Sequence, residues 1–325
     1  MKKLLFLTTC TLFILTGCAL FSSTDSKFSR ELYDAYYEKN EFDEALEFVN
    51  ERLEKYPEDP YLLGEKGYIL IELEKFTDAL KVLEEAESFD STMDSVFNNK
   101  AVALNELGRH EEAAEQAKKA IELEPNEPEQ YANLGNALSY LEQYEEALTN
   151  FDKSLEIDSD LDYAIYGKGA AHYFLDEYDE AIESFETYLT YDPNDLDTYW
   201  YLTYIYDELE EYDKTIEYID LLIENGEEDI FNTLDYKGYL LTFLDRMDEA
   251  NEVYDDLIEH YPDEAFSYYG KSGVLINSGK MEDGLKYLST ALEMDPTLVD
   301  WLMEDPLFYD VFDNKKFQKI INSYE

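Results

Sequence analysis

Hydrophobic residues recur at spacings of three and four along most of the chain, from residue 26 to the end. In residues 128–161, one such stripe consists of Tyr131, Leu134, Gly135 and Leu138. A second stripe begins at Ala147 and includes Phe151 and Leu155. Side chains three and four residues apart share one face of an α-helix. The pattern therefore predicts pairs of amphipathic helices, and each helix needs a neighbour to bury its apolar face.

These helix pairs repeat with a fixed period of 34 residues. A pair of mostly acidic residues precedes a small residue once in each period, at Ala45, Ala79, Ala113, Ala147, Ala181, Thr215, Ala250 and Gly284. One inserted residue near Ile230 lengthens a single step of this series. The period divides the chain into eight units, 26–59, 60–93, 94–127, 128–161, 162–195, 196–229, 231–264 and 265–298. Such a period predicts a stack of helical hairpins whose contacts are all local.

Three further positions of the unit also repeat. Position 8 is small, as Gly67, Ala101, Gly135, Gly169, Gly238 and Ser272. Position 17 is aromatic, as Phe42, Phe76, Tyr144, Tyr178 and Tyr212, and position 32 is proline, as Pro57, Pro125, Pro193, Pro262 and Pro296. This pattern resembles the tetratricopeptide repeat (TPR), over nearly all of the chain after residue 25. The resemblance implies an all-α fold, a right-handed superhelical solenoid of about eight helix-turn-helix units.

Residues 299–325 are predicted to form a helical cap at the end of the array. Asp305 and Pro306 form a helix start, and the apolar residues that follow are Phe308, Val311, Phe312, Phe317, Ile320 and Ile321. The repeat pattern is broken at Tyr33, Thr203, Thr215 and Gly284. We expect looser packing at these four positions, without a change of fold.

The first 17 residues have the features of a secretory signal peptide. Lys2 and Lys3 precede an apolar stretch that is too short to serve as a permanent membrane span. The segment 15–18, Leu-Thr-Gly-Cys, resembles the lipobox of bacterial lipoproteins. That resemblance implies lipidation of Cys18, with residues 18–25 as a tether. The protein is then anchored on the extracytoplasmic side, in the cell membrane of a Gram-positive or the outer membrane of a Gram-negative bacterium.

The charge of the chain is extreme, with 25 basic and 77 acidic residues and a net charge of −52. This excludes a nucleic-acid partner, which requires a basic face. It also excludes polybasic attraction to anionic lipids, so contact with the membrane is expected through the lipid anchor alone. Two explanations of the acidity stay open: the solvated surface of a halophile, or a surface that binds cations weakly.

The sequence contains no pattern of residues typical of a catalytic site. His110, His172 and His260 are far apart in sequence, and each fits a structural position. Phosphate-binding loops, nucleophile elbows and zinc-protease motifs are absent. We therefore predict a protein that is not an enzyme, with no cofactor and no metal site.

The TPR resemblance implies a concave groove lined by positions 2, 5, 9, 12 and 13 of each first helix, where partners bind. Lys27 and Arg30 are the only basic residues at these positions, which argues against a clamp for a terminal carboxylate. Later units place aromatic residues there: Tyr163, Tyr166, Tyr173, Phe174, Trp200, Tyr204, Tyr239, Phe243, Phe266 and Tyr269. Exposed aromatic side chains are typical binding anchors.

Two functions fit this groove. The favoured one is a scaffold that binds a protein or peptide with apolar and basic side chains. The alternative is a surface lipoprotein that binds cell-wall or secreted polysaccharide by stacking sugars on the aromatic rings. A third interpretation assigns the aromatic residues to composition alone, because the chain has 30 tyrosines.

Overall fold

The computed structural model describes residues 41–324, in which every regular element is helical. The chain divides between Tyr191 and Asp192 into two compact units. The sequence predicts one unbroken array, and the division falls where α10 (Tyr178–Tyr188) ends after 11 residues. The second helices of most other hairpins have 14.

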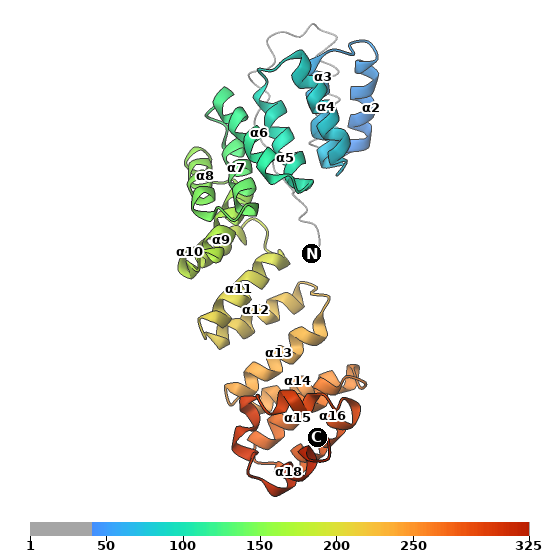
Figure 1. Ribbon diagram of the computed structural model, residues 1–325, viewed down its shortest axis with the longest axis vertical. Helices are drawn as coiled ribbons and strands as arrows, with labels where there is room; N and C mark the ends of the chain where they lie inside the picture. Colours follow the sequence, from blue (N-terminus) through green and yellow to red (C-terminus); the bar gives the residue numbers. More distant parts are fainter. Residues whose placement is uncertain (1–40, 325) are drawn as a thin grey trace. The chain divides into compact units, whose positions relative to one another are not determined.

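The first compact unit contains the helices that precede this division (Figure 1). In chain order they are α2 (Phe42–Leu53), α3 (Pro60–Glu72), α4 (Phe76–Phe89), α5 (Asp94–Glu106), α6 (His110–Leu123), α7 (Pro128–Tyr140), α8 (Tyr144–Ile157), α9 (Asp162–Phe174) and α10 (Tyr178–Tyr188). From α3 onward they form consecutive antiparallel hairpins, each packed on the next.

The second compact unit repeats this arrangement and then ends in three short helices. Its helices are α11 (Leu196–Glu208), α12 (Tyr212–Glu224), α13 (Ile230–Phe243), α14 (Met247–His260), α15 (Ala265–Asn277), α16 (Met281–Met294), α17 (Leu298–Leu302), the 3-10 helix η2 (Pro306–Val311) and α18 (Lys315–Ile321). Long first helices and second helices alternate with the 34-residue spacing of the sequence, apart from the inserted residue before α13.

One residue with a positive φ forms the turn inside each hairpin from α3 to α16. Glycine occupies two of these turns, whereas acidic residues occupy the other five, Glu74, Glu142, Asp176, Glu210 and Asp245, with φ between 56° and 60°. After α7, the Glu142 amide donates to the Ser139 carbonyl (3.0 Å) and the Gln143 amide to the Leu138 carbonyl (2.9 Å). These two bonds close the helix in a Schellman motif. The turns thus satisfy the last carbonyls of the helix, although a side chain with a Cβ disfavours this conformation.

The core lies between successive helices and consists of small residues facing large ones. Phe151 of α8 fits between α7 and α9, where a Cβ at Gly135 or Gly167 would come within 2.7 or 2.5 Å of its ring. Tyr254 of α14 has the same relationship to one glycine in α13 and one in α15. The repeated small residue at position 20 is fully buried in Ala45, Ala79, Ala113, Ala147, Ala181, Thr215 and Ala250. Glycine is therefore required where three helices meet around one large side chain.

The positions expected to pack loosely are in fact well packed. Thr203 and Thr215 are buried, and the Thr203 hydroxyl donates to the Tyr199 carbonyl at 2.8 Å. At Gly284, a Cβ would lie 2.6 Å from the Ile276 side chain, so an alanine does not fit there. The expectation was wrong for these three residues because each neighbourhood has adjusted to its unusual residue. Tyr33 lies outside the described residues.

The last residues cover α15 and α16. Leu298, Leu302, Phe308, Val311, Phe317 and Ile321 are buried in one cluster with the apolar side chains of these helices. Asp305 accepts a hydrogen bond from the Leu307 amide (2.9 Å) and so begins η2 at the position predicted from Asp305-Pro306. The segment shields the final hairpin from water, as an end of a helical array requires.

Cys18, the lipobox pattern and the tether lie outside the described residues. In the described part of the chain, no helix combines the length and the apolar composition needed to cross a membrane.

Candidate functional site

Phe174, an expected groove residue at the end of α9, packs on the preceding hairpin. Its ring stacks on Tyr144 of α8 with centroids 5.0 Å apart and planes 11° apart. His110 and Tyr140 form the equivalent stack one unit earlier, at 4.4 Å. In the second compact unit Phe243 meets Tyr212 edge to face at 5.3 Å. Position 13 thus joins neighbouring hairpins through the aromatic residue at position 17, although Phe174 and Phe243 each keep about half of their surface exposed.

The other three expected residues of α9 are partly buried. Tyr163 packs against the core cluster of the first compact unit. The Tyr166 ring contacts α10, with centroid distances of 5.9 Å to Phe185 and 5.1 Å to Tyr188. Tyr173 meets Phe174 edge to face at 5.3 Å. These side chains hold the fifth hairpin together and leave little free aromatic surface.

Trp200 and Tyr204 form the clearest exposed aromatic feature of α11. They are four residues apart, and their rings stack at 5.6 Å with planes 26° apart. Tyr204 is 52% exposed and Trp200 is partly buried. The opposite side of α11 supplies Leu202, Ile205 and Tyr206 to the core. The stacked pair therefore belongs to a second face, separate from the face that folds the hairpin.

The loop before α13 orients this aromatic pair. The Trp200 indole N–H donates to Glu227 Oε2 at 2.7 Å, and Glu227 Oε1 accepts the Asp229 amide at 2.9 Å. Gly226 takes a φ of 94°, which favours glycine. This is the loop that contains the inserted residue, and it has no proline at the place where other units have one.

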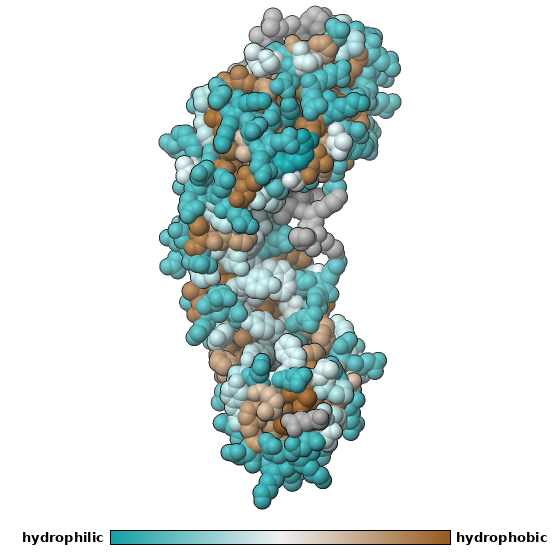
Figure 2. All heavy atoms as spheres, in the orientation of Figure 1, coloured by the Kyte–Doolittle hydropathy of each residue, from teal (hydrophilic) through white to brown (hydrophobic). Residues whose placement is uncertain are grey.

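A recess of about 230 Å³ lies beside the Trp200–Tyr204 pair, between α11 and α13. We call it the α11–α13 recess. It is lined by Trp200, Thr203, Tyr204, Asp207, Ile219, Asp229, Asn232, Thr233 and Tyr236. Figure 2 shows pale side chains of intermediate hydropathy over α11 to α13, which suits a surface rich in Tyr, Trp and Thr. The recess thus has an aromatic wall and a polar rim with two carboxylates.

Hydrogen bonds fix the carboxylates of the recess. The Tyr236 hydroxyl donates to Asp207 Oδ1. Burial, followed by this bond and the charge of Asp207, raises the pKa of Tyr236, so its proton stays on the phenol. Asp229 accepts from the Asn232 amide (3.3 Å) and from the Asn232 side chain (2.8 Å), which begins α13. A carboxylate accepts about four hydrogen bonds, so each retains capacity for a donor in the recess.

The remaining expected residues differ in how much surface they offer. Tyr239 and Phe266 are partly buried, and Phe266 contacts Trp301 edge to face at 6.0 Å. Tyr269 is buried, and its hydroxyl donates to Asp305 at 2.8 Å. The C-terminal cap covers Tyr269, so this residue belongs to the core and does not line an exposed groove.

Asp235, at position 5 of its unit, is an ionisable group in a tyrosine-rich interior. Burial raises the pKa of its carboxyl to about 7, and the hydrogen bond from Tyr254 partly opposes this rise. Tyr254 is fully buried, and its own pKa is raised by burial and by the charges of Asp235 and Asp305. Asp235 is therefore a carboxyl that takes up a proton near neutral pH.

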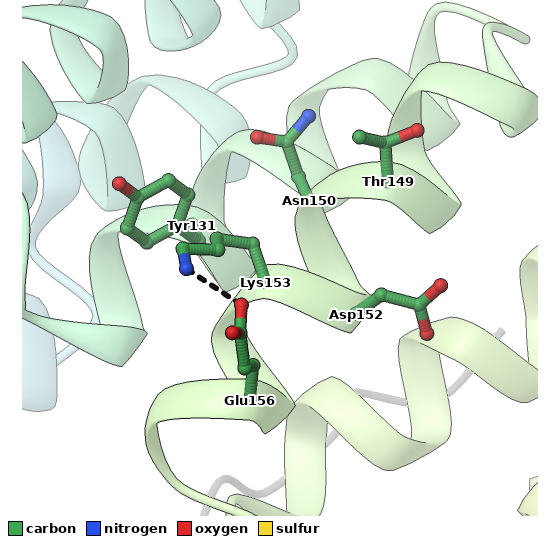
Figure 3. Close-up of a pocket in the computed structure, with 6 residues that line it drawn as sticks. All are labelled: Tyr131, Thr149, Asn150, Asp152, Lys153 and Glu156. Carbon is green, nitrogen blue, oxygen red and sulfur yellow. Dashed lines mark hydrogen bonds and ion pairs between the residues drawn. The ribbon is translucent and has the colours of Figure 1, made fainter.

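A second depression lies on the first compact unit, over α8. It has a volume of about 500 Å³ and is lined by Tyr131, Thr149, Asn150, Asp152, Lys153 and Glu156. Figure 3 shows Lys153 extending along Tyr131 toward Glu156, with which it forms an ion pair of 2.6 Å. Asp152 pairs with Lys168 at 2.6 Å. The charges of this depression are already paired within the protein.

The three histidines have structural partners. His110 stacks on Tyr140, His172 Nδ1 lies 2.7 Å from Glu177, and His260 Nδ1 lies 2.9 Å from the Asp256 carbonyl. Among residues 41–324, no group of three or more His, Cys, Asp or Glu side chains is placed to hold a metal ion.

The sequence missed two features of this surface. The first is the contact between positions 17 and 13 of neighbouring units, which requires the crossing of α8 and α9 to be known. The second is the contribution of Glu227 and Asp229 to the aromatic pair on α11. The inserted residue before Ile230 was the available signal, because it marks the one loop that departs from the period.

Models of the tetratricopeptide repeat match residues 30–94, 95–127, 128–161, 163–195 and 233–264. Together these segments make up more than half of the chain. The chain is a tetratricopeptide repeat protein. Proteins built from this repeat are scaffolds for protein–protein interaction, and in general they are not enzymes. Comparison with curated protein sequences gave no match.

Solved structures of other TPR proteins resemble the chain in fold. A TPR protein from Parabacteroides merdae ATCC 43184 has 17% identity and a TM-score of 0.50, with 93% of this chain and 99% of that chain covered. PilF of Pseudomonas aeruginosa has 18% identity and a TM-score of 0.52, with 64% and 94% covered. PilW, a type IV pilus biogenesis factor, has 17% identity and a TM-score of 0.52, with 62% and 94% covered. At these identities the likeness concerns the fold alone.

Proposed function

We propose that this TPR protein binds an extended protein or peptide segment through the groove face of α11 and α13. The observation that carries the proposal is the stacked Trp200–Tyr204 pair, which lies beside a recess and outside the core. Helices that have already buried one apolar face do not require a second aromatic stripe for folding. Tyr and Trp are also frequent anchors at protein interfaces.

The partner has apolar and basic side chains. The net charge of −52 produces a strongly negative potential, which attracts positive segments and repels acidic ones. Stacked rings provide apolar contact area at low entropic cost. Packing then supplies affinity, while charge governs which partners approach.

The protein performs this role on the extracytoplasmic side of a bacterial membrane, to which a lipid on Cys18 tethers it. This part of the proposal rests on the lipobox pattern of residues 15–18. Growth with an alkyne-modified fatty acid tests it: the wild type should become labelled, and Cys18→Ser should not. Equal labelling of both proteins would refute the anchor without affecting the groove.

Site-specific photocrosslinking in cells tests the groove. A photoreactive amino acid replaces Tyr204 in one strain and Lys286, an exposed residue of α16, in the control strain. We expect a discrete polypeptide adduct at position 204, absent at position 286, with one sequence recurring in its mass spectra. Trp200→Ala should reduce the yield of that adduct. Equal adducts at both positions would contradict a groove partner.

Polysaccharide is the second candidate ligand, because two exposed stacked rings also match the faces of sugar rings. Affinity electrophoresis through gels containing cell-wall polysaccharide distinguishes the two functions. Retardation of the wild type that is lost in Trp200→Ala/Tyr204→Ala, without a polypeptide adduct at position 204, would favour the carbohydrate function. Circular dichroism of the double variant should first show unchanged helicity.

A further inference from the structure

We infer that the α11–α13 recess binds one arginine side chain of the partner, with the guanidinium against the Trp200–Tyr204 pair and its N–H groups directed to Asp207 and Asp229. This inference deepens the proposed function and rests on it. The groove by itself calls for an apolar and basic partner, whereas the recess specifies which residue is read and where.

The aromatic wall of the recess is held in place before any ligand arrives. Glu227 accepts the indole N–H of Trp200, and the Asp229 amide holds the other oxygen of Glu227. Tyr204 stacks on the other ring and keeps half of its surface open. A flat cation placed over such rings is attracted by their π-electrons, most strongly over tryptophan. The wall therefore costs little ordering entropy when the cation binds.

The carboxylates of the recess lack a cation of their own. Within the described part of the chain, neither Asp207 nor Asp229 nor Glu227 takes part in an ion pair. Helix α11 and the loop 225–229 contain no lysine or arginine. The lysines of α12 and α13 are already engaged, since Lys214 pairs with Glu217 and Lys237 with Asp220. An external cation is therefore the complementary occupant.

Arginine fits these groups better than lysine does. Its guanidinium is planar, so it stacks on a ring while its edge donates to carboxylates in a forked geometry. Lysine carries a compact, strongly hydrated ammonium group that loses more hydration and cannot stack. A recess of about 230 Å³ with one aromatic wall and two separate carboxylates matches the flat, multiply donating group.

The inserted residue explains how the recess arose within a regular array. The loop between α12 and α13 is the one place where the spacing exceeds 34 residues, and it supplies both Glu227 and Asp229. A departure from local regularity that builds a polar site is expected at functional positions.

The experiment uses Trp200 fluorescence in the full-length chain carrying Trp301→Phe. The chain has two tryptophans, and Trp301 is 65% exposed, so its replacement leaves Trp200 as the single reporter. The probes are acetyl-Gly-Arg-Gly-amide, its lysine analogue and its citrulline analogue, which keeps the shape of arginine without the charge. We expect saturable binding of the arginine probe, weaker binding of the lysine probe and none of the citrulline probe.

Conservative variants locate the bound probe. Asp207→Asn and Asp229→Asn each keep a hydrogen-bond acceptor for Tyr236 and for the α13 amide, so the fold is retained. Each should weaken the arginine probe about tenfold, the loss expected for one charge-assisted hydrogen bond. Asp248→Asn is the matched control, because it removes one exposed charge in the same compact unit, at the start of α14.

Three outcomes overturn the inference. Equal binding of citrulline and arginine would exclude a charged subsite. Equal weakening by Asp248→Asn and the two recess variants would indicate general attraction to an acidic protein. Absence of arginine binding, together with a polypeptide adduct at position 204, would refute the arginine subsite and leave the proposed function standing. Absence of both would refute the proposed function as well.

Discussion

The ring of Phe174 lies nearly parallel to the ring of Tyr144, with centroids 5.0 Å apart, and so joins α9 to the hairpin before it. A binding role for position 13 predicts free aromatic surface, whereas the structure also gives this residue a structural contact. The same positions meet in His110–Tyr140 and in Tyr212–Phe243. Contacts between neighbouring units determine how cooperatively a repeat array unfolds.

Removal of the Tyr144–Phe174 stack should weaken the coupling between the fourth and fifth units. We expect a coupling energy of about 0.5–1.5 kcal/mol in a double-mutant cycle of Tyr144→Ala and Phe174→Ala. Urea denaturation followed by circular dichroism measures it. Tyr61→Ala, at a 61% exposed ring of α3, is the control and should leave the midpoint nearly unchanged. Additive effects of the two substitutions would show that the stack contributes nothing.

The acidic residues in the hairpin turns predict an easy gain in stability. Glu142→Gly should stabilise the chain by about 0.5–1 kcal/mol, because Glu142 has a φ of 60°, which glycine adopts without strain. Thermal unfolding measures the change. Glu115→Gly, at an exposed position inside α6, removes the same charge and should destabilise by about 1 kcal/mol. A destabilised Glu142→Gly variant would show that the glutamate side chain has a stabilising role at the turn.

Two glycines inside helices should respond in opposite ways to alanine. Gly135→Ala should destabilise by about 1–3 kcal/mol, because its Cβ would lie 2.7 Å from the Phe151 ring. At Gly64 the nearest atoms are 3.5 Å away, so Gly64→Ala should stabilise α3 by up to about 1 kcal/mol. Chemical denaturation compares the two variants. Addition of Phe151→Leu should reduce the cost of Gly135→Ala, and failure of that rescue would place the strain elsewhere.

Stability should depend on pH through Asp235, whose pKa is about 7 in the folded protein and near the ordinary 3.8 when unfolded. Above pH 7 the carboxyl is charged in both states, and its burial lowers stability. As the pH falls from about 7 to about 4, the folded state binds a proton that the unfolded state does not, so stability rises. Asp235→Asn should therefore be more stable than the wild type at pH 8, by up to about 4 kcal/mol.

The difference between Asp235→Asn and the wild type should disappear toward pH 4. Thermal melts across this range measure it, with Asp248→Asn as the control for the general relief of repulsion between acidic residues. A constant difference at every pH would mean that Asp235 titrates normally in the folded protein.

The sequence predicted the helices and turns closely because each hairpin packs through contacts within about one period. Asp305-Pro306 identified the start of η2, and the spacing of small residues identified the places where helices cross. Position 20 is fully buried in seven units for this reason. The same local logic failed at Thr203 and Gly284, where the surrounding side chains accommodate residues that the repeat pattern does not predict.

The amino-acid sequence by itself determined the repeat, the charge, the helix bounds and the choice of α11 as an aromatic surface, because these depend on residue type and local spacing. The tertiary structure decided which aromatic residues remain available. Tyr269 is covered by the C-terminal cap, Phe174 is placed on Tyr144, and Trp200 is turned toward a recess. Those outcomes depend on how one helix crosses the next and where a loop closes, and both are properties of packing between units that spacing along the chain does not contain.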